Sequence, residues 1–353
     1  MELFIRRSRR LLRTALAVAV ALLLTAAVTV TAGAKEVGEE EKMLIPGGHP
    51  FGVRFMTDGV LVTNIRSVSA GGKAVSPGEL AGIRVGDVIV RANGKDVSSA
   101  KEISELVEIC GGGAIALTVR RNGKNTDITL NAVKEDGSGI YRAGLELKDN
   151  MSGIGTVTYV DPDTLEFGGL GHGICDPVTS VLMPLKSGSA MAVRIGGAVK
   201  GKSGRPGEIK GLLLSKRLGS VTKNSECGVF GAFSSLSDAP TPIPVGKRDT
   251  VKEGKALIRT TLGDDGVKEY EIEISKINRE STDNKSFVIT VTDKALKERT
   301  GGIIQGMSGS PIIQNGKLVG AVTHVLIHDP TTGYGIFIEN MLNAAQMPMA
   351  KAS

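Results

Sequence analysis

The sequence predicts a mainly β protein with two folded domains behind an N-terminal membrane segment. The chain has 353 residues, which exceeds the ~100–200 residues of a typical single domain. It contains 47 glycines, aromatic residues make up 3% and tryptophan is absent. This composition favours many short strands and turns over large helical bundles. The membrane segment is predicted from a long apolar run near the N-terminus.

The N-terminal segment, residues 1–34, has the pattern of a membrane anchor or a signal peptide. Five arginines and one glutamate precede a charge-free run of 21 residues, which covers residues 14–34. About 20 apolar residues suffice to cross a bilayer, and the basic flank keeps the N-terminus in the cytoplasm. The run ends in Ala-Gly-Ala, which also suits signal peptidase. We expect a retained anchor or a cleaved signal, with a buried helix as the third alternative, and an extracytoplasmic location for the rest.

Charge and cysteine content exclude several classes. The formal net charge is +6, but the arginine-rich start leaves 38 basic and 36 acidic residues in the remainder. No basic stripe is interleaved with aromatic residues, so we expect no nucleic-acid partner. The odd number of cysteines, Cys110, Cys175 and Cys227, argues against a disulfide scaffold and leaves one Cys175–Cys227 bond open. His172-x-x-Cys175 lacks a second ligand pair, so no metal or cofactor is expected.

The first folded domain is expected at residues 46–135, after an acidic linker at residues 35–45. Alternating apolar runs predict strands in PGGHPFGVRFMTDGVLVTNI and in DVIVRANG. SSAKEISELVEICGGG predicts a helix, because Ser99 and Glu102 have capping-box spacing and the apolar residues recur on one face. The dipeptides Asn93-Gly94 and Asn122-Gly123 predict hairpin turns.

These elements together resemble a PDZ domain. The resemblance is carried by SPGELAGIRVGDVIVRANGKDV, by the single amphipathic helix and by the hairpin after it. It implies that a peptide adds as an extra strand beside the second strand of the domain. The loop before that strand would contain Phe51, Gly52 and Val53, which are therefore the expected peptide-binding residues. This loop departs from the GLGF form, and the alternative is that Phe51 and Val53 pack in a core.

The second domain is expected at residues 136–353. The segments GIGTVTYV, AMAVRIGG, GVFGAF, ALIRTTL, YEIEISKI and SFVITVT all have strand patterns. Two stacked antiparallel barrels would accommodate them. Only one short later helix is expected, near residues 293–298, and Asn315-Gly316 predicts a further hairpin turn.

The segment GMSGSP, residues 306–311, is the candidate nucleophile loop. Acyl transfer needs a serine oxygen, a base and donors for the oxyanion. A glycine two residues before Ser308 allows the N–H groups of Gly306 and Ser308 to point the same way, which predicts an oxyanion hole. The segment resembles GDSGGP of chymotrypsin-like serine proteases, with Met307 in place of aspartate. Without that acid, activation through a freed N-terminus is not expected.

A base and an orienting carboxylate must accompany Ser308. Among the four histidines, His172 in GLGHG precedes the serine, as in chymotrypsin-like chains. His324 in THVLIHDP is the rival base, whereas His49 and His328 are expected to be structural or surface residues. For the carboxylate, spacing alone leaves four aspartates open: Asp176, Asp264, Asp265 and Asp293.

A closer resemblance selects among these residues. The segments GLGHGICD, KSGRPGEIKG, VTDKALKERTGGIIQGMSGSPIIQNGKLVGAVTHV and DPTTGYGIFIENML strongly resemble the stage IV sporulation protein B peptidases. The resemblance covers nearly the whole chain and implies a catalytic triad of His172, Asp293 and Ser308. Asp293 has one alternative role, as the N-cap of the helix ALKER.

The resemblance also implies a biological function. Such a peptidase cleaves its own N-terminal region and then cuts a membrane-bound regulator of an intramembrane protease, which leads to sigma-factor activation in sporulation. It acts between the forespore and mother-cell membranes, and its PDZ domain targets it or holds it inactive. The alternative is a membrane-tethered PDZ adaptor with an inert peptidase-like domain, which the presence of all three catalytic residue types argues against.

Overall fold

The computed structural model describes residues 41–236 and 240–346. The chain divides into two compact units, residues 1–42 and 43–353, and the predicted folded domains lie in the second unit. The expected membrane segment at residues 1–34 lies outside the described residues. Within the described ranges, no helix is long and apolar enough to cross a membrane.

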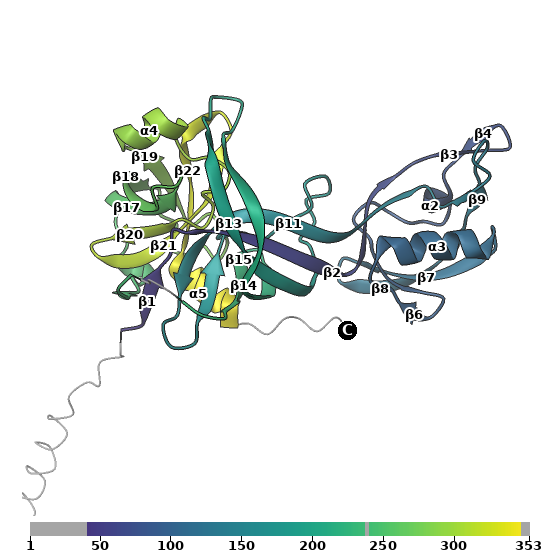
Figure 1. The fold of residues 1–353 in the computed structure, drawn as a ribbon, viewed down its shortest axis with the longest axis horizontal. Coiled ribbons are helices and arrows are strands. Elements are labelled where there is room, and N and C mark those ends of the chain that lie inside the picture. Colours follow the sequence, from purple (N-terminus) through teal and green to yellow (C-terminus); the bar gives the residue numbers. More distant parts are fainter. Residues whose placement is uncertain (1–40, 237–239, 347–353) are drawn as a thin grey trace, which may run out of the picture. The chain divides into compact units, whose positions relative to one another are not determined.

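Six antiparallel strands form the first barrel (Figure 1). Its ring closes because one strand, β2, pairs with both β11 and β13, while β14, β15 and β12 complete the circuit back to β11. These strands are β2 (Pro50–Ile65), β11 (Leu145–Val160), β12 (Glu166–Gly169), β13 (Leu185–Val199), β14 (Glu208–Ser225) and β15 (Gly228–Phe233), with β1 (Met43–Pro46) and β16 (Ile243–Pro244) continuing the sheet from β11.

Six further antiparallel strands form the second barrel, which is closed by the pairing of β20 with β17. They are β17 (Gly254–Thr261), β18 (Val267–Ser275), β19 (Phe287–Val291), β20 (Pro311–Gln314), β21 (Lys317–Leu326) and β22 (Asp329–Phe337). Isoleucines and valines fill its core because they alternate along each strand. The prediction of two antiparallel barrels is confirmed.

Two helices and one 3₁₀ turn accompany the second barrel: α4 (Lys294–Thr300), α5 (Ile338–Gln346) and η1 (Arg248–Thr250). The short helix expected near residues 293–298 corresponds to α4. The expectation of only one later helix is wrong, because α5 ends the described chain. Its apolar residues Ile338, Met341 and Leu342 lie at i, i+3 and i+4, a spacing that places them on one helical face.

The PDZ elements lie between β2 and β11 in the sequence. They comprise β3 (Val68–Ala70), β4 (Lys73–Val75), α2 (Pro77–Leu80), β5 (Val88–Ala92), β6 (Lys95–Asp96), α3 (Ala100–Cys110), β7 (Ala114–Arg121), β8 (Lys124–Asn131), β9 (Val133–Lys134) and β10 (Tyr141–Arg142). The N-cap of helix α3 is Ser99, whose hydroxyl accepts from the Glu102 backbone N–H, as the capping-box spacing predicts. Its C-cap is Gly111, which has a φ of 55°.

A buried ion pair organises the Gly-Asp turn of this domain. Asp87 is 1% exposed, and its two carboxylate oxygens each lie 2.7 Å from the Arg121 guanidinium. The same carboxylate accepts from the Arg84 amide at 2.8 Å. A buried charge is tolerated only when it is paired and hydrogen-bonded, and these contacts satisfy Asp87. The turn that begins β5 is therefore fixed to β7.

The boundaries of the PDZ region differ from the predicted 46–135. The first part of β2 pairs with β13 inside the first barrel at residues 52–57, and only Val60 and Leu61 pair with the PDZ strand β5. Strand β11 returns beside β2 along most of its length. The PDZ elements are therefore inserted between two paired strands of the first barrel.

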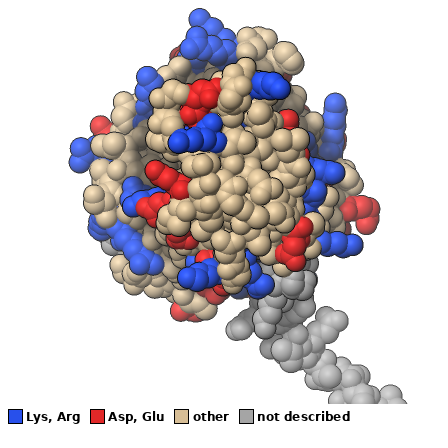
Figure 2. Space-filling view, turned by 90° about the vertical axis from the view of Figure 1, so that its right-hand side faces the viewer, with Lys and Arg blue, Asp and Glu red and all other residues tan. Residues whose placement is uncertain are grey.

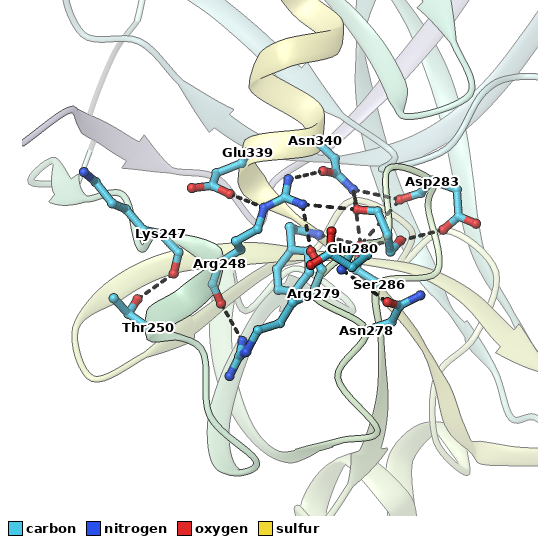
Figure 3. A network of polar contacts seen from close by, with 12 residues as sticks. Lys247, Arg248, Thr250, Asn278, Arg279, Glu280, Asp283, Ser286, Glu339 and Asn340 are labelled. Carbon is cyan, nitrogen blue, oxygen red and sulfur yellow. Dashed lines mark hydrogen bonds and ion pairs between the residues drawn. The ribbon is translucent and has the colours of Figure 1, made fainter.

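Arg248 connects α5 to the loop between β18 and β19 (Figure 3). Its Nε lies 2.6 Å from Glu339 Oε2, and its Nη2 donates to Asn340 Oδ1 at 2.8 Å. Nη1 donates to the Arg279 carbonyl at 2.9 Å, and the guanidinium lies 5.3 Å from the ring centroid of Phe337. Each of these contacts uses a different part of the planar guanidinium. The network holds the loop between β18 and β19 against α5.

The charged residues do not form a patch of a single sign on the face shown in Figure 2. Lysine and arginine lie among aspartate and glutamate around a centre without charged side chains. Mixed surfaces of this kind lack the long-range field of a single sign that concentrates a charged partner.

Candidate active site

Thr156 on β11 connects the two loops that carry the predicted catalytic residues. Its N–H donates to the carbonyl of Ser308 at 2.9 Å, and its carbonyl accepts from the N–H of Leu170 at 3.2 Å. Its hydroxyl donates to the Gly306 carbonyl at 2.8 Å. Leu170 directly precedes the GHG segment, so the structure brings the serine loop and the histidine loop to the same point on β11.

The nucleophile loop depends on its glycines. Gly306 and Gly309 have φ values of 98° and 92°, a region that side-chain-bearing residues rarely adopt. A Cβ atom at Gly309 would lie 2.1 Å from the Thr156 carbonyl oxygen and 2.4 Å from the Leu170 nitrogen. Met307, which takes the place of aspartate, is fully buried in the core of the second barrel. The loop can therefore approach β11 only because glycine occupies residue 309.

The Ser308 hydroxyl donates to the carbonyl of Thr323 on β21 at 2.8 Å. Thr323 is itself held in place, because its own hydroxyl donates to the Asn284 carbonyl at 2.8 Å. In this resting arrangement the proton of the nucleophile faces a carbonyl oxygen, and the hydroxyl must rotate before it can donate to a base. Catalytic hydrogen bonds often tighten only when substrate is bound.

His172 is positioned by its own loop. Leu170 and Gly171 have φ values of 64° and 66° and turn the chain sharply after β12. The Nδ1 atom lies 2.9 Å from the Gly173 carbonyl oxygen. A carbonyl oxygen can only accept, so Nδ1 carries the proton and Nε2 is left as the basic nitrogen. This is the tautomer that a general base requires.

His324, the rival base, lies against His172. The two ring centroids are 4.9 Å apart, with an angle of 36° between the ring planes. Burial, together with the nearby His172 and Lys285, lowers the pKa of His324 to about 4. His324 is therefore neutral near pH 7 and presents an uncharged ring to His172. The other two histidines lie elsewhere, His49 at the start of β2 and His328 in the turn after β21.

Asp293 does not occupy the position expected of an orienting carboxylate. Its Oδ1 accepts from the Leu296 amide at 2.8 Å, and its Oδ2 accepts from the Glu271 amide at 3.4 Å. No carboxylate among the described residues bonds to the His172 ring, whose Nδ1 faces Gly173 instead. The expected contact between Asp293 and His172 is therefore not formed in this structure, and the alternative role of N-cap for α4 is confirmed. A catalytic role for Asp293 stays a prediction that rests on the family resemblance alone.

Two substitutions distinguish the N-cap role of Asp293 from a catalytic role. Because asparagine caps a helix as well as aspartate, we expect Asp293→Asn to keep kcat within about threefold of the unmodified protein. Asp293→Ala removes the cap and should lower the free energy of unfolding by about 1 kcal/mol. Peptide hydrolysis and denaturant unfolding measure these two quantities. A loss of about 10⁴-fold in Asp293→Asn would instead assign the carboxylate to the triad.

The two predicted oxyanion donors are available. Among the residues that the structure describes, neither the N–H of Gly306 nor that of Ser308 donates to a protein acceptor. The carbonyls of both residues accept hydrogen bonds from Thr156, and these bonds fix the adjoining peptide groups. The assignment of these N–H groups to an oxyanion hole stays a prediction, and the geometry leaves them free for it.

The histidine pair also predicts a pH dependence. Burial lowers the pKa of His172 below its ordinary value of 6.5, so the neutral, basic form persists at lower pH. We expect the acid limb of the kcat/KM profile to have a midpoint below 6.5, because kcat/KM reports the free enzyme. An acid limb at or above 6.5 would contradict this assignment of the base. The Thr323→Ala variant keeps both imidazoles and serves as the control, so the midpoint of its acid limb should equal that of the unmodified protein.

The peptide-binding residues predicted for the PDZ domain are wrong. Phe51 and Val53 are 0% and 1% exposed in the core of the first barrel, where the Phe51 ring meets that of Phe167 at 5.4 Å. Gly52 pairs with Met191 of β13 and Ile154 of β11. The alternative that Phe51 and Val53 pack in a core is confirmed. The prediction failed because β2 belongs to both domains, which short-range patterns cannot reveal.

A groove of about 480 Å³ lies elsewhere on the PDZ domain, beside α3. Its walls come from α3, including the buried Ile103 and Val107, and from the segment that leads into β11. Along Leu145–Lys148, β11 pairs with β2 on one edge, and Ala143-Gly144 forms the loop between β10 and this strand. This arrangement of loop, strand edge and helix is the one that PDZ domains use for peptides. No signal in the sequence distinguished it from the loop at residues 50–53.

All three cysteines, each within the described ranges, have free thiols. The possible disulfide between Cys175 and Cys227 is not formed in this structure. The Cys227 thiol instead lies 3.6 Å from the Thr282 carbonyl oxygen.

Two antiparallel barrels, with a serine loop and a histidine loop meeting at one strand, define a serine peptidase of the double-barrel class. The family model of the SpoIVB peptidase S55 matches residues 139–342, which is more than half of the chain. The chain therefore belongs to the SpoIVB peptidase S55 family and is a serine peptidase. A PDZ domain model matches residues 68–121, which confirms the PDZ prediction.

Solved structures with related folds are distant. The PDZ domain of the SdrC-like protein from Listeria monocytogenes is 21% identical over 26% of this chain and 87% of its own, with a TM-score of 0.22. The Rv3671c protease from M. tuberculosis is 13% identical in its active form, over 56% of this chain and 76% of its own, with a TM-score of 0.33. Its inactive form is 16% identical, over 55% of this chain and 85% of its own, with a TM-score of 0.31. At these TM-scores the assignment rests on the family models.

Proposed function

We propose that Ser308 and His172 carry out peptide-bond hydrolysis. The hydroxyl of Ser308 turns from the Thr323 carbonyl to Nε2 of His172 and attacks the scissile carbonyl as its proton passes to the imidazole. The N–H groups of Gly306 and Ser308 stabilise the oxyanion. His172 then returns the proton to the leaving amine, and water releases the acyl group by the reverse sequence. The joining of both loops at Thr156 is the observation that carries this proposal.

The substrate is a protein, as the combination of a peptidase with a PDZ domain indicates. We propose that the enzyme first cleaves its own N-terminal region and then the extracytoplasmic part of a membrane-bound regulator of an intramembrane protease. That second cut would lead to sigma-factor activation in sporulation, with the enzyme anchored or secreted between the forespore and mother-cell membranes. The family name and the apolar N-terminal run support this proposal.

The groove beside α3 gives the PDZ domain a separate task in this proposal. A peptide would add to the free edge of β11 at Leu145–Lys148, and it would target the enzyme or hold it inactive. The N-terminal region of the same chain and the substrate regulator are the two proposed occupants.

The test compares the full chain with Ser308→Ala and Ser310→Ala in a sporulating host. Ser310 is the matched control, because its buried hydroxyl has no hydrogen-bond partner in the structure and the change removes the same oxygen from the same loop. Terminal sequencing and intact mass should show N-terminal cleavage in the unmodified protein and in Ser310→Ala only. Cleavage that persists in Ser308→Ala would overturn the proposed nucleophile.

The cascade is tested in the same strains. Sigma-factor activity should be lost in Ser308→Ala and retained in Ser310→Ala. Active Ser308-dependent cleavage without any effect on the sigma factor would overturn the sporulation part of the proposal and leave the hydrolytic part standing.

A further inference from the structure

A free strand edge runs from Thr156 away from the catalytic loops. The backbone of Thr156 faces Ser308 and Leu170, whereas the next N–H, that of Val157, donates to His49 on the β2 side. Successive residues of a strand direct their N–H and C=O groups to opposite edges. Ser152 and Ile154 therefore direct theirs to the same edge as Thr156. Among the described strands, β12 alone pairs with that edge, and only from Val157 onward, whereas β1 continues the β2 side.

A cavity of about 310 Å³ opens beside this edge. Ser152, Gly153 and Ile154 form one wall, and Ile209 and Leu213 of β14 form the other. The side chain of Ile154 crosses toward β14, since its Cδ1 would lie 2.8 Å from a Cβ placed at residue 211, which is a glycine. The apolar side chains that line the cavity are thus aliphatic, and the side chain of Ile154 occupies the space that a Cβ atom at Gly211 would need.

The cavity extends to the proposed oxyanion loop. Gln305 and Gly306 also line it, together with Glu208. The loop is held there by β14, because the Gln305 amide donates to Gly207 and its carbonyl accepts from Ile209, both at 2.8 Å. A substrate carbonyl bound at Gly306 therefore has the cavity directly beside it, and the chain on that side of the carbonyl leads onto the free edge of β11.

We propose that this cavity and the β11 edge form a substrate subsite for one side of the scissile bond. The substrate segment adds to β11 as an extended strand, with backbone hydrogen bonds to Ser152 and Ile154, and an aliphatic side chain fills the space between Ile154 and Leu213. Main-chain pairing supplies affinity, and the pocket supplies selectivity. The substrate class is an unfolded or extended peptide with a leucine-sized residue near the cleaved bond. This inference rests on the proposed function of Ser308 and Gly306.

The experiment uses the full chain and a library of tryptic peptides from an unrelated bacterial proteome. Leu213→Ala enlarges the pocket, and Leu212→Ala is the matched control, because Leu212 is 62% exposed and neighbouring side chains of a strand point to opposite faces. Ser152→Pro removes one N–H from the free edge without touching the pairs with β2. Terminal sequencing of the products identifies the residues on both sides of each cut, and a fluorophosphonate reports the reactivity of Ser308 separately.

We expect the unmodified protein and Leu212→Ala to select aliphatic residues on one side of the cut. Leu213→Ala should lower kcat/KM for those peptides about tenfold and shift the selection toward aromatic residues, since filling a pocket less well costs of this order. Ser152→Pro should raise KM for peptides while Ser308 still reacts with the fluorophosphonate, which shows that the protein is folded.

Identical selection by Leu213→Ala and Leu212→Ala would overturn the subsite while leaving the proposed function intact. An unmodified protein in which Ser308 neither reacts with the fluorophosphonate nor cleaves any peptide would overturn the proposed function, and the subsite with it.

Discussion

His172→Ala is expected to lower kcat by roughly 10⁴- to 10⁶-fold, the range seen when the base of a serine peptidase is removed. The physical reason is the loss of Nε2, the nitrogen that the Gly173 carbonyl keeps unprotonated. Without it, the proton of Ser308 has no acceptor of suitable pKa, and the hydroxyl stays on the Thr323 carbonyl. Peptide hydrolysis under saturating substrate measures the loss, and circular dichroism verifies that the variant is folded.

His328→Ala is the control for this variant. It removes the same side chain from an exposed position in the turn between β21 and β22, so we expect kcat to stay within about twofold. His324→Ala tests the rival base directly. If His324→Ala abolished turnover and His172→Ala spared it, the assignments of the two imidazoles would have to be exchanged.

Gly309→Ala should disable the site without removing any catalytic group. Its new Cβ would lie 2.1 Å from the Thr156 carbonyl oxygen, so the serine loop must move away from β11. A displacement of about 1 Å costs on the order of 100-fold in rate, and we expect at least this loss in kcat. The clash and the unfavourable φ of 92° should together lower the free energy of unfolding by about 3 kcal/mol.

Gly316→Ala separates these two causes. Its φ of 73° imposes a similar backbone strain, but nothing lies within 4 Å of the added Cβ. We expect a loss of about 1 kcal/mol in unfolding free energy and no change in kcat. Equal activity in Gly309→Ala and Gly316→Ala would show that contact between the serine loop and β11 does not position the nucleophile.

Local elements of the fold were predictable because their causes are local. Asn93-Gly94, Asn122-Gly123 and Asn315-Gly316 all form hairpin turns in which both residues have positive φ, as this dipeptide requires. The serine and histidine loops were found in the same way, through glycines that permit tight turns. Asp293 was recognised as a candidate N-cap because that role depends on the next three residues alone.

Features that depend on contacts between residues far apart in the sequence could not be predicted. The domain boundary was misplaced because residues 50–57 and 58–65 form one continuous strand whose partners lie about 90 residues away. The prediction of the peptide-binding residues was wrong for the same reason. The contact of His172 with His324 was also not predictable, because it joins residues of two different barrels. The expected bond between Asp293 and His172 joined two residues 121 positions apart, and no pattern along the chain could test whether both reach the same place.

The shared strands β2 and β11 make the PDZ region a removable insertion. The chain leaves the first barrel through β2 and re-enters it through β11, and these strands are already paired antiparallel at Met56 and Asn150. A two-residue Asn-Gly turn could join strands at that separation, and every pairing of the six-stranded ring involving residues 50–56 and 150–156 would be preserved. An insertion into a single hairpin is thus enough to add the PDZ domain to the double-barrel peptidase fold.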